Sequence, residues 1–264
     1  CVMLRSFQME NTPEVRSGLL LALGAAVAAH ILLIGGTRLL KGPLGLSRLE
    51  EALVIYTNAG NLIVPIVAAV LGEEWLIYAG AYMSVQIVLV WTHLSLLLLP
   101  QRRVNLLRVL RNPSVIAIIG GLLLFVTGVR LPGIVDTALA SVGGMAGPLG
   151  MLITGMLIGR MNLRQIFAAR RVYRIVLLRM AVMPLLCTGL MILLNRIFPV
   201  RGGAVILLIS LLACITPPAA TVTQMAQLCG ADAEYASVVS VLATLVCILT
   251  MPVIVFAYQL VCPL

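Results

Sequence analysis

Long apolar runs, separated by short stretches that contain charged residues, proline or glycine, dominate the pattern of this chain. A helix that crosses a bilayer needs about 20 mostly apolar residues, and eight runs approach or exceed that length. They are residues 18–40, 51–71, 75–99, 114–129, 137–159, 175–197, 203–229 and 235–261. Short links join most of them, so neighbouring helices should pack antiparallel. The pattern predicts an all-α membrane protein with eight transmembrane helices.

The composition agrees with this prediction and excludes several other classes of protein. Of the 264 residues, 61% are hydrophobic and only 10% are charged, whereas soluble domains carry about a quarter charged residues. The low aromatic content and the lack of alternating polar and apolar positions argue against an outer-membrane barrel. A soluble enzyme, a disordered chain and a nucleic-acid binder are thereby excluded. The six cysteines lack the spacing of a zinc site, so no metal is expected.

Basic residues gather in alternate links between the predicted helices. Thirteen of the 18 lysines and arginines fall on one side: Arg38, Lys41, Arg48, Arg102, Arg103, Arg108, Arg111, Arg160, Arg164, Arg170, Arg171, Arg174 and Arg179. Cytoplasmic links of membrane proteins carry an excess of lysine and arginine. We therefore expect this side to be cytoplasmic, which places the C-terminus outside the plasma (inner) membrane.

The chain also contains an internal repeat. In a register shifted by 158 positions, Arg16 aligns with Arg174, Arg38 with Arg196, Gly72 with Gly230 and Thr92 with Thr250. The shift covers five crossings, an odd number, so the two copies should run oppositely through the membrane, as in many secondary transporters. We expect residues 1–100 to form the first repeat, 101–113 a cytoplasmic linker and 114–264 the second repeat. Counterparts of two spans in the second repeat would precede residue 1, which predicts a parent of ten spans, truncated at its N-terminus.

Equivalent spans of the two repeats are both interrupted by polar residues and prolines. The first has Asn58, Gly60, Asn61 and Pro65 at its middle, and the second has Pro217 and Pro218, followed by Thr221 and Gln224. Proline removes a backbone N–H and clashes with the preceding turn of a helix. Breaks are therefore predicted at residues 60–65 and 217–221. Paired broken helices at corresponding positions point to the binding site of a transporter.

The predicted breaks favour an anionic substrate. Each break exposes the N-terminus of a half-helix, whose unpaired N–H groups and partial positive charge attract anions. The residues expected to bind substrate are Asn58, Gly60, Asn61, Thr216, Thr221 and Gln224. The alternative is that these polar groups only cap the breaks and bond neighbouring helices.

The two interrupted segments resemble those of the auxin efflux carrier family. Residues 58–65 with Gly72 are similar to the fourth span of that family, and residues 217–220, 226–230 and 250–252 to its ninth and tenth spans. The similarity covers essentially the whole chain, beginning within the second span of the family. One departure is Val64, where the family usually has a small residue before the proline.

The resemblance implies ten spans in two inverted five-helix repeats, with crossed broken helices that form the site. It also implies the transport of small organic anions, such as dicarboxylates in bacterial members and auxin in plant members. Many plant members have a long hydrophilic central loop where this chain has only residues 100–113, so the chain is similar to the prokaryotic branch.

His30 and His93 are the titratable side chains expected deep within apolar segments. A histidine can change charge near neutral pH, so either could couple proton movement to transport. The alternative is a neutral histidine bonded to a neighbouring helix. A sodium site built from asparagine, threonine and backbone carbonyls at the breaks is the other coupling mode, and no cofactor is expected.

The sequence thus predicts a secondary transporter, a permease that moves a small organic anion by alternating access. The alternatives are a sodium-coupled bile-acid-type symporter and a membrane receptor or scaffold that does not transport. An intramembrane enzyme is not expected, because the chain has no His-Glu-x-x-His pattern. The expected partners are the anion and the lipid bilayer. Glycines at residues 143–147 and 155–159 permit close helix contact, either within the protomer or across a homodimer.

Overall fold

The computed structural model describes residues 1–99, 110–111, 113–145 and 170–263, with a few isolated positions between 145 and 170. Regular secondary structure in these ranges is helical. The helices are α1 (Val2–Ser6), α2 (Pro13–Leu44), α3 (Arg48–Ile55), α4 (Ala59–Val70), η1 (Glu73–Trp75), α5 (Leu76–Leu89), η2 (Val90–Leu94), α6 (Ser95–Leu98), α8 (Pro113–Thr127), α9 (Gly133–Gly144), α12 (Arg170–Leu177), η3 (Leu178–Val182), α13 (Met183–Ile197), α14 (Gly203–Cys214), α15 (Ala220–Leu228) and α16 (Ala233–Val261). The predicted all-α class is confirmed.

Within the described residues, four continuous helices are long and apolar enough to cross a membrane. They are Pro13–Leu44, Glu73–Leu98, Arg170–Ile197 and Ala233–Val261. Local sequence sets the ends of the first of these. Thr12 caps it by accepting a hydrogen bond from the backbone N–H of Val15, and Gly45, with φ of +60°, ends it in the left-handed conformation that glycine adopts most readily.

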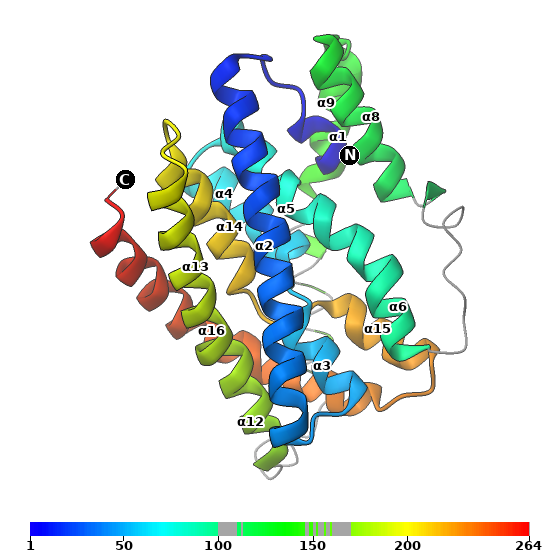
Figure 1. Ribbon diagram of the computed structural model, residues 1–264. Helices are drawn as coiled ribbons and strands as arrows, with labels where there is room; N and C mark the ends of the chain where they lie inside the picture. Colours follow the sequence, from blue (N-terminus) through cyan, green and yellow to red (C-terminus); the bar gives the residue numbers. More distant parts are fainter. Residues whose placement is uncertain are drawn as a thin grey trace.

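The central helix of the bundle is α2, which packs against α5, α13 and α14 (Figure 1). Its buried face carries small side chains, namely Ala22, Ala25, Ala26 and Ala29, all at most 1% exposed. Small residues let helix backbones approach closely in a membrane protein. A second group, in which α1 packs against α8 and α9, lies at one corner of the molecule (Figure 1).

The other four predicted spans correspond to helices that are divided or shorter than predicted. The predicted spans 51–71 and 203–229 are each divided into two helices, α3 with α4 and α14 with α15. Span 114–129 corresponds to α8, whose 15 residues cover about 22 Å, less than the roughly 30 Å of a hydrocarbon core. Span 137–159 overlaps α9, which ends at Gly144. The rest of that span, the glycine pattern that continues to residue 159 and the linker at 101–113 lie mostly outside the described residues.

Candidate functional site

The two divided helices meet at their interruptions. Residues 56–58, between α3 and α4, lie antiparallel to residues 217–219, between α14 and α15. The N–H of Asn58 donates to the carbonyl of Pro217 (2.8 Å), and the N–H of Ala219 donates to the carbonyl of Tyr56 (3.0 Å). We call these paired segments the crossing. In Figure 1, α3 and α15 lie toward one end of the bundle and α4 and α14 toward the other.

The pairing explains why two adjacent prolines are tolerated in the crossing. Thr57 and Pro218 lie opposite each other, and the two backbone hydrogen bonds come from the residues beside them. Such a position needs no N–H from Pro218. Pro217 contributes only its carbonyl, which it retains. Proline therefore prevents a continuous helix here without leaving an unpaired hydrogen bond in the crossing.

The other edge of residues 56–58 is paired with a side chain from α5. The amide of Gln86 donates from Nε2 to the carbonyl of Thr57 (2.8 Å), while its Oε1 accepts from the Thr57 hydroxyl and, at 3.4 Å, from its N–H. Gln86 thus acts on Thr57 as a neighbouring strand would. Both residues are buried, so the backbone groups of Thr57 would otherwise be unpaired away from water.

Four helix ends adjoin the crossing. The first turns of α4 and α15 begin directly after it, at Ala59 and Ala220, and neither helix has a side-chain cap. Their N–H groups carry a partial positive charge. The last turns of α3 and α14, which end at Ile55 and Cys214, carry a partial negative charge.

Arg179 bonds both of the C-terminal helix ends. Its guanidinium donates to the carbonyl of Val54 (3.0 Å) on α3, and to those of Cys214 (2.7 Å) and Thr216 (2.7 Å) after α14. The side chain is fully buried and lies in the π-helical turn η3, within the long helix Arg170–Ile197. A carbonyl can only accept hydrogen bonds, so a side chain with several donors, such as arginine, suits two helix ends whose last carbonyls lack a helical N–H partner.

Arg179 and Gln86 are missed by the sequence analysis. The charge pattern places Arg179 with the cytoplasmic links and leaves the two histidines as the titratable groups deep in apolar segments. In the structure, Arg179 is instead fully buried within a long apolar helix. A signal was present, because Arg179 lies five residues into the apolar run 175–197 and Gln86 in the middle of the run 75–99. Isolated polar residues inside apolar spans are expensive and are often functional.

The predicted substrate-binding residues occupy different environments around the crossing. Asn58, which immediately precedes α4, accepts a hydrogen bond from the amide of Asn61 (3.1 Å), and Gly60 lies between them in the first turn. Thr216 is fully buried, and its hydroxyl donates to the carbonyl of Ala213 (3.0 Å), so it caps α14. Thr221 lies in the first turn of α15, and Gln224 is exposed further along that helix.

The first break does not lie where Pro65 predicted it. Pro65 is inside α4, and the helix continues through it from Ala59 to Val70. In a helix, Pro65 deprives only the carbonyl of Asn61 of a partner, and Asn61 is exposed. The interruption instead lies at residues 56–58, where the chain pairs with residues 217–219. Pro217 and Pro218, at the second predicted break, lie between α14 and α15.

His93 is linked to the crossing through Tyr56. The hydroxyl of Tyr56 donates to the carbonyl of Leu89 (3.1 Å) and lies 2.8 Å from Nδ1 of His93. The tautomer of His93 decides whether the hydroxyl or Nδ1 donates in this second contact. The backbone carbonyl of the same tyrosine accepts from Ala219 in the crossing.

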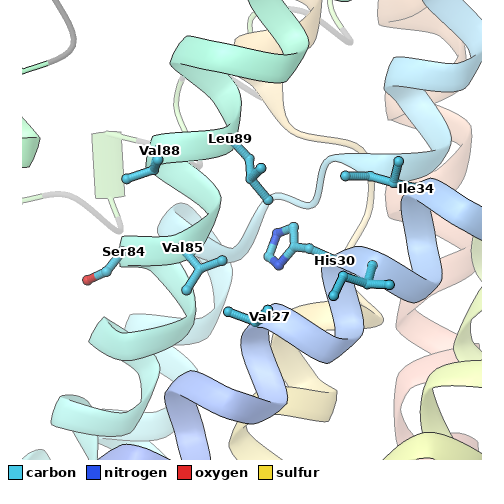
Figure 2. Close-up of a pocket in the computed structure, with 8 residues that line it drawn as sticks. Val27, His30, Ile34, Ser84, Val85, Val88 and Leu89 are labelled. Carbon is cyan, nitrogen blue, oxygen red and sulfur yellow. The ribbon is translucent and has the colours of Figure 1, made fainter. Parts of the chain in front are cut away.

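His30 lies in a separate pocket between α2 and α5. Its Nδ1 is 2.7 Å from the carbonyl of Ala26, one turn earlier on α2. Figure 2 shows the imidazole directed from α2 toward Val85 and Leu89 of α5. The pocket has a volume of about 420 Å³, and most of its lining is apolar. The imidazole also approaches the side chain of Gln86, which pairs with Thr57 in the crossing, so His30 is buried one residue away from the interrupted segments.

A cluster of polar residues at the start of α3 joins the two halves of the chain. The carboxylate of Glu50 pairs with Arg171 of α12 at 2.6 and 2.7 Å and accepts from the hydroxyl of Tyr235 on α16 at 2.9 Å. Ser47 and Glu50 also form a capping box. Nearby, Lys41 pairs with Glu51. Among the described residues, no group of three His, Cys, Asp or Glu side chains could hold a metal ion.

The chain matches one known family of proteins. The family described as membrane transport protein matches residues 100–255, more than half of the chain. The chain belongs to this family, that of the auxin efflux carriers. A search of curated proteins gave no match. Family membership and the long apolar helices together make this a multi-pass membrane protein, and the matched region contains α14, α15 and the second half of the crossing.

Proposed function

We propose that this member of the membrane transport protein family is a secondary transporter that moves a small organic anion across the plasma membrane by alternating access. The observation that carries the proposal is the crossing, after which two uncapped helices, α4 and α15, begin. Uncapped helix N-termini bind anions well. Asn58, Gly60 and Asn61 on one side, and Thr216, Thr221 and Gln224 on the other, are proposed to bind the substrate.

The proposal includes an architecture of eight spans from a parent of ten, in two inverted repeats. Its support is that α3 and α4 progress in one direction along the bundle and α14 and α15 in the opposite direction (Figure 1). The antiparallel pairing of the two interruptions agrees with this relationship.

Transport by the purified protein in lipid vesicles tests the proposal. We expect flux of a small carboxylate, and we expect Asn58→Leu and Asn61→Leu to reduce it at least tenfold while the protein still inserts. Asn195→Leu is the matched control, because Asn195 is half-buried like Asn58 but lies near the end of α13. Normal transport by both the Asn58 and Asn61 variants would rule out this binding site.

We further propose that His93, rather than His30, is the residue that would couple protons to substrate movement. His93 contacts Tyr56, a residue of the crossing itself, directly, whereas His30 reaches the crossing through the side chain of Gln86. In vesicles, uptake driven by a proton gradient and lost in His93→Gln, but kept in His30→Gln, supports this assignment. Uptake that requires a sodium gradient instead supports the sodium-coupled alternative.

A further inference from the structure

The helix ends at the crossing carry no net charge by themselves. A helix terminus is equivalent to roughly half an elementary charge, positive at the N-terminus and negative at the C-terminus. Each interruption creates one end of each kind, since α3 ends where α4 begins and α14 ends where α15 begins. The four partial charges therefore sum to zero, so the preference of the two N-termini for an anion depends on what offsets the two C-termini.

Arg179 changes this balance. Arginine keeps its charge in proteins, and this guanidinium bonds the carbonyls of Val54, Cys214 and Thr216 at the two negative ends. One full positive charge offsets two half-charges of opposite sign. The positive N-termini of α4 and α15 then remain, and the crossing has a net charge of about +1.

No carboxylate neutralises Arg179 among the described residues. The two buried carboxylates of α3, Glu50 and Glu51, pair with Arg171 and Lys41 instead. The side chain is 0% exposed, and its Nε–H has no hydrogen-bond partner in the described part of the chain. The crossing as a whole therefore keeps its net charge of about +1, which is costly at membrane depth, and this favours a bound anion that supplies the balancing negative charge.

We propose that Arg179 is the fixed positive charge that makes the crossing select anions, and that it acts through its electric field without contacting the substrate. The inference rests on the proposed function, because it assumes that the substrate binds at the crossing. Arg179 is thus a positioning residue in two respects. It holds both helix ends in place, and it sets the sign of the charge that the site accepts.

The expected size of the effect follows from distance. The guanidinium of Arg179 bonds the carbonyl of Thr216, and α15 begins four residues later. Even a fully extended chain therefore keeps the guanidinium within about 14 Å of the first residue of α15. At about 12 Å and an effective dielectric constant of about 20, one charge changes the affinity of a monovalent anion about tenfold. A dianion should be affected about a hundredfold.

The test uses three ligands of similar shape and different charge: succinate, its half-amide succinamate, and succinamide. Their dissociation constants are measured on the purified full chain, wild type and R179Q. We expect R179Q to weaken the binding of succinate about a hundredfold and that of succinamate about tenfold, with little change in the binding of succinamide. A purely structural role would weaken all three equally, and that result would overturn the inference.

A second variant covers the case in which R179Q does not fold. R179K keeps the charge, but a lysine, unlike arginine, can lose its proton at a buried position within an accessible pH range. We expect R179K to prefer succinate over succinamide at pH 7 and to lose this preference as the pH rises, while the wild type keeps it. A preference in R179K that does not change with pH overturns the inference. A wild type that does not distinguish succinate from succinamide overturns the proposed function itself.

Discussion

At the scale of single residues, the crossing depends on two polar side chains that stand in for secondary structure. Gln86 pairs with the backbone of Thr57 as a strand would. Arg179 donates hydrogen bonds to carbonyls at the ends of α3 and α14, which have no further helical N–H to bond. Membrane-embedded backbone groups must be paired within the protein, because lipid offers no partner. The interrupted helices therefore need both side chains in order to be stable.

Replacing Gln86 tests this dependence. In Gln86→Leu, the N–H and carbonyl of Thr57 lose their partner while still buried, and leaving such a group unpaired costs about 1–3 kcal/mol. We expect thermal unfolding of the detergent-solubilised protein to show a loss of stability of this order. Val88→Leu, on the exposed side of α5, should change stability by less than about 0.5 kcal/mol. Equal stability of Gln86→Leu and wild type would contradict the role assigned to the amide.

The sequence predicts some elements of the site well and others poorly, for identifiable reasons. The second break was predictable because Pro217 and Pro218 forbid a continuous helix locally. The pattern predicts the first break at residues 60–65, after the actual interruption at residues 56–58, because that interruption depends on pairing with residues 217–219, far along the chain. Arg179 was assigned to a link for the same reason: its partners, Val54 and Cys214, are 125 and 35 residues away. Local sequence patterns predict where a helix is interrupted, but they do not predict which distant residues bond the backbone at the interruption.

At the scale of elements, the link from α14 to α15 allows the pairing to be tested at two adjacent positions. Ala219 has φ of −64° and an extended backbone, so proline fits its conformation, but Ala219→Pro removes the N–H that bonds Tyr56. Ala220→Pro places proline at the first position of α15, where it is favoured and no N–H is needed. We expect Ala219→Pro to lower stability by about 1–3 kcal/mol and Ala220→Pro to leave it nearly unchanged, as measured by thermal unfolding. Similar losses in both variants would show that the hydrogen bond to Tyr56 is unimportant.

At the scale of the whole molecule, Glu50 holds the beginning of α3 against α12 and α16, which come from the other half of the chain. Burial by itself raises the pKa of Glu50, but the hydrogen bonds from Arg171, Ser47 and Tyr235 outweigh it and lower the pKa to about 2. This is below the ordinary value of about 4.3 for glutamate. The charged form is therefore the one that stabilises the fold.

Glu50→Gln should consequently destabilise the protein in a way that depends on pH. At pH 7 we expect a loss of about 1–3 kcal/mol, because hydrogen bonds to a charged group are replaced by weaker ones. The contribution of Glu50 is complete above about pH 4.3 and disappears as the pH falls toward 2. Thermal unfolding of wild type and variant should therefore differ equally at pH 7 and pH 5 and converge below pH 4. Glu74→Gln, at an exposed position, is the control; a difference between wild type and Glu50→Gln that persists at pH 2 would contradict this account.

The placement of the two ends of the bundle relative to the membrane is the last prediction. The end of α2, with Lys41, and the start of α3, with Arg48, lie at one end of the molecule. The C-terminus and the link between α13 and α14 lie at the other (Figure 1). The excess of basic residues predicts that the first end is cytoplasmic. In a cysteine-free background, a membrane-impermeant thiol reagent added to intact cells should label Arg201→Cys and Pro263→Cys, both at exposed positions. Arg48→Cys, an equally exposed arginine replacement at the other end, should be labelled only after the membrane is opened. The reverse pattern would invert the molecule and place the C-terminus in the cytoplasm.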